Sequence, residues 1–245
     1  MNTNETLNQT LNKIWTKYKF NDTDKIIFLT IVSPIFTHPE FQKRLDSSLY
    51  PHHDTTSLGE HILSDAAVTY KLSQNSKTDQ YLAVIIAMFH DLYEIPWQNS
   101  GIIKNDFFNK HGFVHPIEGA INAATWYPEF FNQDKKSEII IDGIIHHMFP
   151  FPVRALNGDD IELNNQIKLA ELPINIRNII ISSTLRNKIG KISLCSSKFS
   201  EGKIVSKADK VVSFSKDFTI PGALACITGI NKNLENALEE QNKSR

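Results

Sequence analysis

An apolar segment that ends in a charged pair places the tightest constraint on how this chain can fold. Residues 82–89 carry only apolar side chains, and His90 and Asp91 follow without a break. The pattern predicts a helix over about 80–93 that is buried nearly all round. A carboxylate at the end of such a helix needs a cationic partner, because charged groups are almost never fully buried unless they are paired or metal-bound.

Histidine is concentrated in one part of the chain. All nine histidines precede position 148. Histidine is a common metal ligand and a general acid or base near neutral pH, so this region is where we look for a site. His61 lies on a helix predicted to start after Ser57, and Asp209 lies between apolar residues far downstream. Together with the His90-Asp91 pair, these residues supply two imidazoles and two carboxylates, which suit a divalent first-row metal.

Three further histidines stand where predicted helices begin or end, and they can serve a second ion. His115 directly precedes a helix predicted over 116–127 that begins with proline. His146 and His147 end another predicted helix. Asp91 has two carboxylate oxygens and could bridge two metals.

Composition excludes several classes of protein. Hydrophobic residues make up 41% of the chain, which supports a packed core and argues against disorder. There are 26 basic and 27 acidic residues, so no bulk attraction to nucleic acid or to a membrane surface is expected. Two cysteines exclude a disulfide-dense scaffold. Neither a signal-peptide pattern nor a bilayer-spanning apolar run is visible, so we expect a cytoplasmic protein, whose oligomeric state the sequence does not indicate.

The rest of the pattern is mostly helical. Weak alternation over 191–195 and 203–206 predicts a short β-hairpin within 190–206, too little strand for a large sheet. No linker, repeat or low-complexity tract interrupts the chain, so a single all-α domain over 1–245 is expected. Further helices are predicted over residues 7–18, 24–33, 58–72, 138–147, 167–187, 206–217 and 221–241.

The ordered candidate ligands resemble a known family. The order is His61, His90-Asp91, His115, His146/His147 and Asp209. This order is similar to the six-ligand form of the HD-domain superfamily of metal-dependent phosphohydrolases. Local sequence supports the likeness, since His115-Pro116, His147-Met148-Phe149-Pro150 and Ala208-Asp209-Lys210 resemble a bacterial subgroup of HD hydrolases.

The resemblance implies an all-α HD-domain bundle with the metals at its centre. It covers about 37–150 and 203–217, which would form the metal-ligand core, and 1–36 would add N-terminal helices. Residues 153–205 would be an insertion, longer than the link expected in that subgroup. No GYP signature follows the double histidine, so cyclic-dinucleotide hydrolysis of the class that carries it is not supported.

The resemblance also implies the ligands of each metal. The first metal would be held by His61, His90, Asp91 and Asp209. The second would be held by Asp91, His115 and one or both of His146 and His147, with His147 favoured because similar sequences carry histidine directly before methionine. The ions, two per chain, could be Fe, Mn, Co, Ni, Zn or Mg.

Two cations held close together would support phosphate-ester hydrolysis. They would hold a hydroxide between them and lower the pKa of bound water from about 15.7 toward about 7. The substrate would be a small phosphomonoester or phosphodiester, for example a nucleotide-like molecule. Two alternatives stay open: a di-iron oxygenase of the same superfamily, and a degenerate HD domain that senses a ligand without turnover.

Other residues are candidates for catalysis or substrate contact. Besides Asp91, the catalytic candidates are Glu94, as a proton shuttle or a hydrogen-bond acceptor for a metal-bound histidine, and Lys210 beside Asp209. For most lysines and arginines the alternative is a simply solvated side chain. One of His52 and His53 could also reach substrate or metal. Candidates for substrate binding are Arg44, His111, Arg154 and Lys198.

Overall fold

The computed structural model describes residues 3–52, 56–94, 107–157 and 169–214, and helices dominate them. The expectation of an all-α protein is confirmed. The α-helices are α1 (Thr3–Lys17), α2 (Asp22–Phe36), α3 (Pro39–Lys43), α4 (Leu58–Ser73), α5 (Gln80–Phe89), α6 (His111–Trp126), α7 (Asp134–Ile145), α8 (Ile174–Thr184) and α9 (Ser200–Phe214). Short 3-10 helices are η1 (Phe107–Asn109), η2 (Pro128–Phe131) and η3 (Leu169–Glu171). The strands are β1 (Pro51–His52), β2 (Thr56–Ser57), β3 (Val153–Arg154), β4 (Lys188–Ile189) and β5 (Ile192–Ser193).

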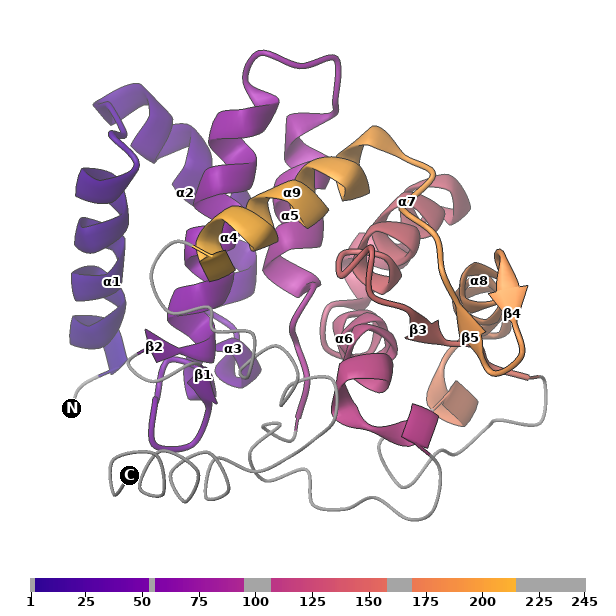
Figure 1. Ribbon diagram of the computed structural model, residues 1–245. Coiled ribbons are helices and arrows are strands. Elements are labelled where there is room, and N and C mark those ends of the chain that lie inside the picture. Colours follow the sequence, from indigo (N-terminus) through magenta and orange to yellow (C-terminus); the bar gives the residue numbers. More distant parts are fainter. Residues whose placement is uncertain (1–2, 53–55, 95–106, 158–168, 215–245) are drawn as a thin grey trace, which may run out of the picture.

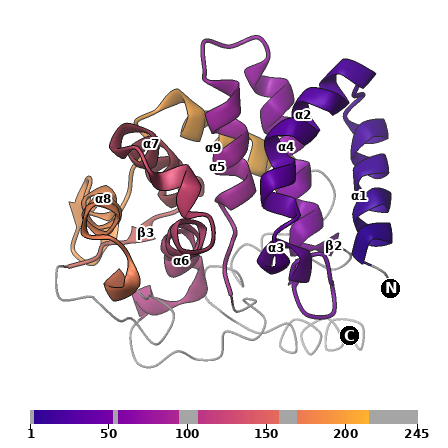
Figure 2. The ribbon, with the colours of Figure 1, turned by 180° about the vertical axis from the view of Figure 1, so that it is seen from behind.

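Helices α4 and α5 pack side by side at the centre, and the other helices are arranged around them (Figure 1). Helix α9 crosses both and also contacts α7. Seen from behind, α1 and α2 lie on one side of this pair, and α6, α7 and α8 lie on the other (Figure 2). Side chains that α4, α5, α6, α7 and α9 direct into the interior can therefore meet in one place.

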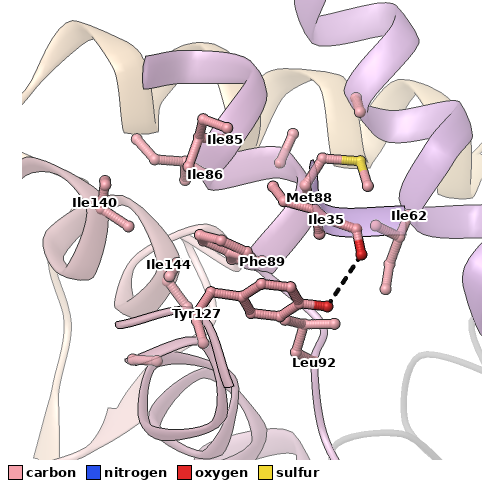
Figure 3. Close-up of a cluster of buried hydrophobic side chains, with 14 of the residues drawn as sticks. Ile35, Ile62, Ile85, Ile86, Met88, Phe89, Leu92, Tyr127, Ile140 and Ile144 are labelled. Atoms are coloured by element: carbon pink, nitrogen blue, oxygen red, sulfur yellow. Dashed lines mark hydrogen bonds between the residues drawn. The ribbon is translucent and has the colours of Figure 1, made fainter. Parts of the chain in front are cut away.

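The core is built around the apolar segment of α5. Every residue of 82–89 is buried, as the sequence predicts for this helix. Phe89 packs against Tyr127 at a ring-centroid distance of 5.1 Å, and the Tyr127 hydroxyl donates a hydrogen bond of 3.2 Å to the Ile35 carbonyl (Figure 3). A fully buried aliphatic or aromatic side chain contributes roughly 1.5–3 kcal/mol to stability, so this segment holds α5 firmly in place.

Several helix ends differ from the sequence prediction. Helix α5 ends at Phe89, where residues up to about 93 were expected to be helical. Helix α2 continues through Pro34 to Phe36 instead of stopping before the proline. Proline lacks the backbone N–H that would donate to the preceding turn, so one helical hydrogen bond is lost at Pro34. Burial of Ile35 and Phe36 in the last turn offsets the free energy of that lost bond.

Two helix starts also differ. Helix α6 begins at His111, so Pro116 lies in its second turn rather than at its first position. Helix α7 begins at Asp134 rather than at 138, and the Ser137 hydroxyl donates to the Gln133 carbonyl from inside the helix. Helix α4 begins directly after Ser57, as predicted, and the Ser57 Oγ caps it by accepting from the Glu60 amide at 3.2 Å.

The expected hairpin exists with a different partner strand. Strand β5 pairs antiparallel with β4 and with β3, whereas 203–206 lies inside α9. The turn between β4 and β5 contains Gly190 at a φ of 61°, a conformation that favours glycine. A helix was expected over 167–187. The structure describes this stretch from residue 169 onward, where it forms the short helix η3 followed by α8. The helix expected over 221–241 and the end of the one over 206–217 lie outside the described residues.

Paired glycines bring α7 and α9 into close contact. A Cβ atom built on Gly202 would lie 2.6 Å from the Gly143 Cα atom and would also clash with Ser197. The neighbouring Asp142 is buried and accepts hydrogen bonds from the Ser197 hydroxyl at 2.6 Å and from the Lys198 amide at 2.9 Å. The start of α9 is therefore fixed to α7 both by close backbone packing and by a buried carboxylate.

This contact gives a stability prediction. Gly202→Ala should lower the free energy of unfolding by about 1–3 kcal/mol, because the added methyl group has no room between α7 and Ser197. Lys203→Ala changes the next, exposed residue and should leave stability within about 0.5 kcal/mol of wild type. Chemical denaturation of both variants measures the effect, and equal stability would contradict the close crossing.

Candidate metal centre

Five helices bring six titratable side chains together in the interior. The close approach of α6 to the end of α5 depends on Gly119, where a Cβ atom would lie 2.8 Å from the His90 carbonyl oxygen. All six side chains are buried, and we call them the central cluster. Its members are His61 on α4, His90 and Asp91 at the end of α5, His115 on α6, His147 just after α7, and Asp209 on α9.

Asp91 lies between two pairs of imidazoles. Its Oδ2 atom is 3.6 Å from the His61 Nε2 atom and 3.5 Å from the His90 Nε2 atom. Its Oδ1 atom is 3.4 Å from the His115 Nε2 atom and 3.6 Å from the His147 Nε2 atom. Each oxygen of one carboxylate therefore faces its own pair of ring nitrogens.

Within each pair the ring nitrogens lie close together. The Nε2 atoms of His61 and His90 are 3.3 Å apart, and those of His115 and His147 are 3.4 Å apart. Asp209 adds its Oδ1 atom at 3.5 Å from the His61 Nε2 atom, on the side of the first pair. The first group thus offers two imidazoles and two carboxylates, and the second offers two imidazoles and the shared Asp91.

Backbone hydrogen bonds fix the orientation of three of these rings. The Nδ1 atoms of His90 and His147 lie 2.7 Å from carbonyl oxygens three residues earlier, and the His115 Nδ1 atom lies 3.0 Å from the His111 carbonyl oxygen. A carbonyl can only accept, so Nδ1 carries the proton and donates it. In a neutral ring this leaves the Nε2 lone pair directed at the cluster, which is the form that binds metals.

Charges within the cluster shift the pKa values of its members. Burial alone favours a neutral His90, but nearby carboxylates, with Asp91 foremost, outweigh burial and raise the pKa of His90 to about 9. Burial also disfavours the charge of Asp91, but the surrounding imidazoles, led by His90, lower the pKa of Asp91 to about 2. Without a metal ion, His90 is therefore protonated and Asp91 ionised at neutral pH, and a proton supplies the positive charge that the carboxylate needs.

The second pair of histidines is neutral. Burial lowers the pKa of His115, and burial together with the nearby His90 lowers the pKa of His147 to about 3. Neutral imidazoles with inward Nε2 atoms are ready to bind a cation.

The donor set of the central cluster fits a divalent metal. The Asp91 Oδ1 atom is buried and accepts no hydrogen bond from the residues that the structure describes. A buried carboxylate oxygen in this state is costly unless a cation faces it. Two trios of cluster residues, His61/His90/Asp209 and His90/Asp91/His147, each present ligand atoms within 4.8 Å of one another, so the cluster could hold a metal ion.

Two further residues belong to the surroundings of the cluster. His52 also forms a potential ligand trio, with His61 and Asp91, and its ring centroid is 4.0 Å from that of His61. Asp65 is fully buried, and its Oδ2 atom is 3.6 Å from the His90 Nδ1 atom. Sequence reasoning missed Asp65, although its position four residues after His61 on one helix face was a usable signal.

Lys210 and Glu94, the two candidate catalytic residues other than Asp91, lie in different settings. Lys210 is half-buried beside Asp209, its Nζ atom donates to the Ser206 carbonyl at 2.8 Å, and burial lowers its pKa. Glu94 is exposed beyond the end of α5, and its amide donates to the Glu118 carboxylate at 2.7 Å. Glu94 therefore does not fit the expected role of proton shuttle, because the helix that would have carried it to the cluster ends earlier.

Two candidate phosphate ligands have structural roles instead. Arg44 is completely buried, its guanidinium donates to the Tyr93 carbonyl at 2.6 Å, and it stacks on Tyr50 and Trp126. Lys198 is exposed and forms an ion pair with Glu138 on α7. Neither expectation of substrate binding fits this geometry.

The other two candidates lie on α6, the helix that carries His115, and on β3, which packs against it. The His111 ring stacks on the His115 ring at a centroid distance of 4.9 Å and meets the edge of Tyr93. Burial holds the pKa of His111 well below its usual value. Arg154 is buried on β3, which packs against α6, the helix that carries His115.

The two adjacent histidines after α7 point in different directions. His147 joins the central cluster, whereas the His146 Nε2 atom lies 3.2 Å from the Ser183 carbonyl oxygen on α8. The His146 ring also faces the Cys195 Sγ atom at 3.6 Å and Asp142 at 3.9 Å. One or both histidines were expected as ligands, with His147 favoured; the structure places His147 in the cluster and His146 outside it, because the backbone turns between them after the helix ends.

Comparison with protein families, curated proteins and solved structures gave no match to this chain. Among the described residues, no helix combines the length and the apolar character needed to cross a membrane. Interpretation of the cluster therefore depends on its own geometry.

The divergence of the two histidines gives a prediction. His147→Asn should reduce the amount of divalent metal bound per chain, because it removes an Nε2 ligand that faces Asp91. His146→Asn should leave metal content at the wild-type level. Elemental analysis of both purified variants measures the difference, and equal losses in the two would contradict the placement of His146 outside the cluster.

Proposed function

We propose that the chain is an HD-type metal-dependent phosphohydrolase that cleaves a small phosphate ester. The observation that carries the proposal is the position of Asp91, whose two oxygens each face a separate pair of imidazoles. A ligand order that resembles the HD superfamily in sequence also converges in space. Six donors spread over more than a hundred residues of sequence have no other evident reason to meet in the core.

We propose two divalent ions per chain. His61, His90, Asp91 and Asp209 would hold one, and Asp91, His115 and His147 would hold the other. Imidazole and carboxylate donors accept Fe, Mn, Co, Ni or Zn, and Mg would be the least suited because it prefers oxygen ligands.

The chemistry of the proposal follows from charge. Divalent cations bound there would lower the pKa of a coordinated water toward about 7 and would offset the charge of a phosphate group. The chain's own residues supply the geometry: Asp91 fixes the spacing of the two groups, and the backbone carbonyls hold the imidazoles in the ligating form. None of the described side chains then has to act as a strong nucleophile.

Several side chains around the cluster suit substrate contact in this proposal. Lys210 lies beside Asp209 and would add positive charge near the phosphate. The His52 Nδ1 atom lies 3.4 Å from the Tyr93 hydroxyl, and the Tyr93 ring meets His111. This row of polar aromatic groups would border the bound ester on the side of α5 and α6.

A second candidate is a di-iron oxygenase, which the donor set favours equally. Four imidazoles and two carboxylates are as suitable for a pair of iron ions as for Mn or Zn. The identity of the bound metal separates the two candidates, since firmly bound iron with oxygen consumption and no phosphatase activity would favour the oxygenase. A metal-free, stably folded protein that binds a nucleotide without turnover would instead support a sensing module.

The hydrolase proposal predicts metal-dependent activity that needs Asp91. Chelator-treated protein should hydrolyse no member of a panel of phosphomonoesters and phosphodiesters, and Mn²⁺, Co²⁺ or Ni²⁺ should restore hydrolysis of at least one. Asp91→Asn should lower the rate by at least about 100-fold, since metal charge is worth several kcal/mol in the transition state and about 1.4 kcal/mol is tenfold.

Glu94→Gln is the matched control, because Glu94 is an exposed carboxylate three residues away. It should retain wild-type activity. Metal-loaded wild-type protein with no activity on any ester of the panel would contradict the proposal, and so would an Asp91→Asn variant that keeps both its metal and its rate.

A further inference from the structure

Asp65 is a buried carboxylate that the proposed function does not use. It lies on α4, one turn after His61, so both side chains project from the same face of the helix. Its exposed fraction is 0%. Neither of its carboxylate oxygens has a hydrogen-bond partner among the residues that the structure describes. The Oδ2 atom lies 3.6 Å from the His90 Nδ1 atom, on the side of the ring that faces away from Asp91.

A carboxylate in this position would destabilise the fold if it had no further role. Burial raises the pKa of the Asp65 carboxyl group well above its usual value, and leaving this group buried without hydrogen bonds is costly, so an apolar side chain of similar size would suit the site better. Its neighbours along α4 show this, since the apolar residues Ile62, Leu63 and Ala66 are also fully buried. The location of Asp65 therefore needs a reason other than packing.

The charge of the central cluster supplies that reason. The two divalent ions proposed above carry four positive charges, and the ligand carboxylates Asp91 and Asp209 offset two of them. The site is buried, so excess positive charge is costly there. A third carboxylate behind a ligand imidazole reduces this excess without occupying a coordination position.

We propose that Asp65 is a positioning residue of the metal centre. The His90 Nδ1 proton is donated to the Ala87 carbonyl at 2.7 Å, and the Asp65 Oδ2 atom faces the same Nδ1 atom at 3.6 Å, so that its charge favours the ring orientation that directs Nε2 toward Asp91. With cations bound at the central cluster, its negative charge would make the imidazole a stronger donor to the cation. This inference rests on the proposed metal centre, and it does not depend on which reaction the centre performs.

The test compares metal binding with the stability of the metal-free protein. Asp65→Asn keeps the shape and an acceptor oxygen but removes the charge. We expect its metal-free melting temperature to be equal to or above that of wild type, because an unsatisfied buried carboxylate is gone. Its affinity for Co²⁺ should fall by about 10- to 100-fold, the usual effect of losing such a partner, and the visible absorption of bound Co²⁺ should shift.

Asp24→Asn is the matched control, because Asp24 is a buried carboxylate that contacts the other end of α4. It accepts from Lys71 at 2.5 Å and from Gln74 at 2.7 Å. Its replacement should lower the melting temperature and leave the Co²⁺ affinity and spectrum unchanged. Asp65→Ser, which also removes the charge, should reproduce the weaker binding of Asp65→Asn.

The possible outcomes separate this inference from the proposed function. Unchanged Co²⁺ affinity and spectrum in both Asp65 variants, with or without a change in melting temperature, would overturn the role of Asp65 and leave the metal centre standing. Wild-type protein that binds no Co²⁺ would overturn both. Weaker binding and an altered spectrum in folded Asp65 variants would support the inference even if no phosphate ester is hydrolysed.

Discussion

The contact of one buried carboxylate with four imidazoles is the interaction on which the rest of the structure depends. Asp91 can be ionised in the core only because His90 and the other rings surround it. This requires α5 to end at the same point where α4, α6, α7 and α9 bring their polar residues inward. The apolar segment of α5 and the aromatic contacts of Phe89 fix that end point (Figure 3). A hydrophobic core and a polar centre thus meet at a single turn of the chain.

A second buried carboxylate, Asp142, anchors residues 186–198, which lie between His147 and Asp209 in the sequence, to α7. Asp142 accepts from the Arg186 guanidinium at 3.0 Å and from Ser197 and Lys198, which directly precede α9. His146 faces this network, and the next residue, His147, faces the central cluster. The adjacent residues His146 and His147 therefore connect the packing of residues 169–200 with the geometry of the cluster. The close contact of Gly143 and Gly202 fixes the distance between α7 and α9.

The sequence was sufficient to predict the all-α class, and the burial of charged residues inside apolar segments indicated partners for Asp91 and Asp209. The convergence of the central cluster was predicted from the resemblance of the ligand order to the HD superfamily. The sequence was not sufficient to predict side-chain direction. Arginine is a residue type that often binds phosphate, but the Arg44 guanidinium is buried and already contacts a backbone carbonyl and two aromatic rings. The divergence of His146 and His147 depends on the backbone turn after α7, which no periodicity indicates. The partner of β5 was missed because two-residue strands leave almost no alternation to detect.

The central claim is that Asp91 bridges two cations. The most direct measurement is anomalous difference density from crystals of the protein loaded with Mn²⁺ or Co²⁺. The account predicts two peaks on either side of the Asp91 carboxylate, one next to His61, His90 and Asp209 and the other next to His115 and His147. A single peak bound by one group alone, a peak away from Asp91, or no peak at all would contradict it.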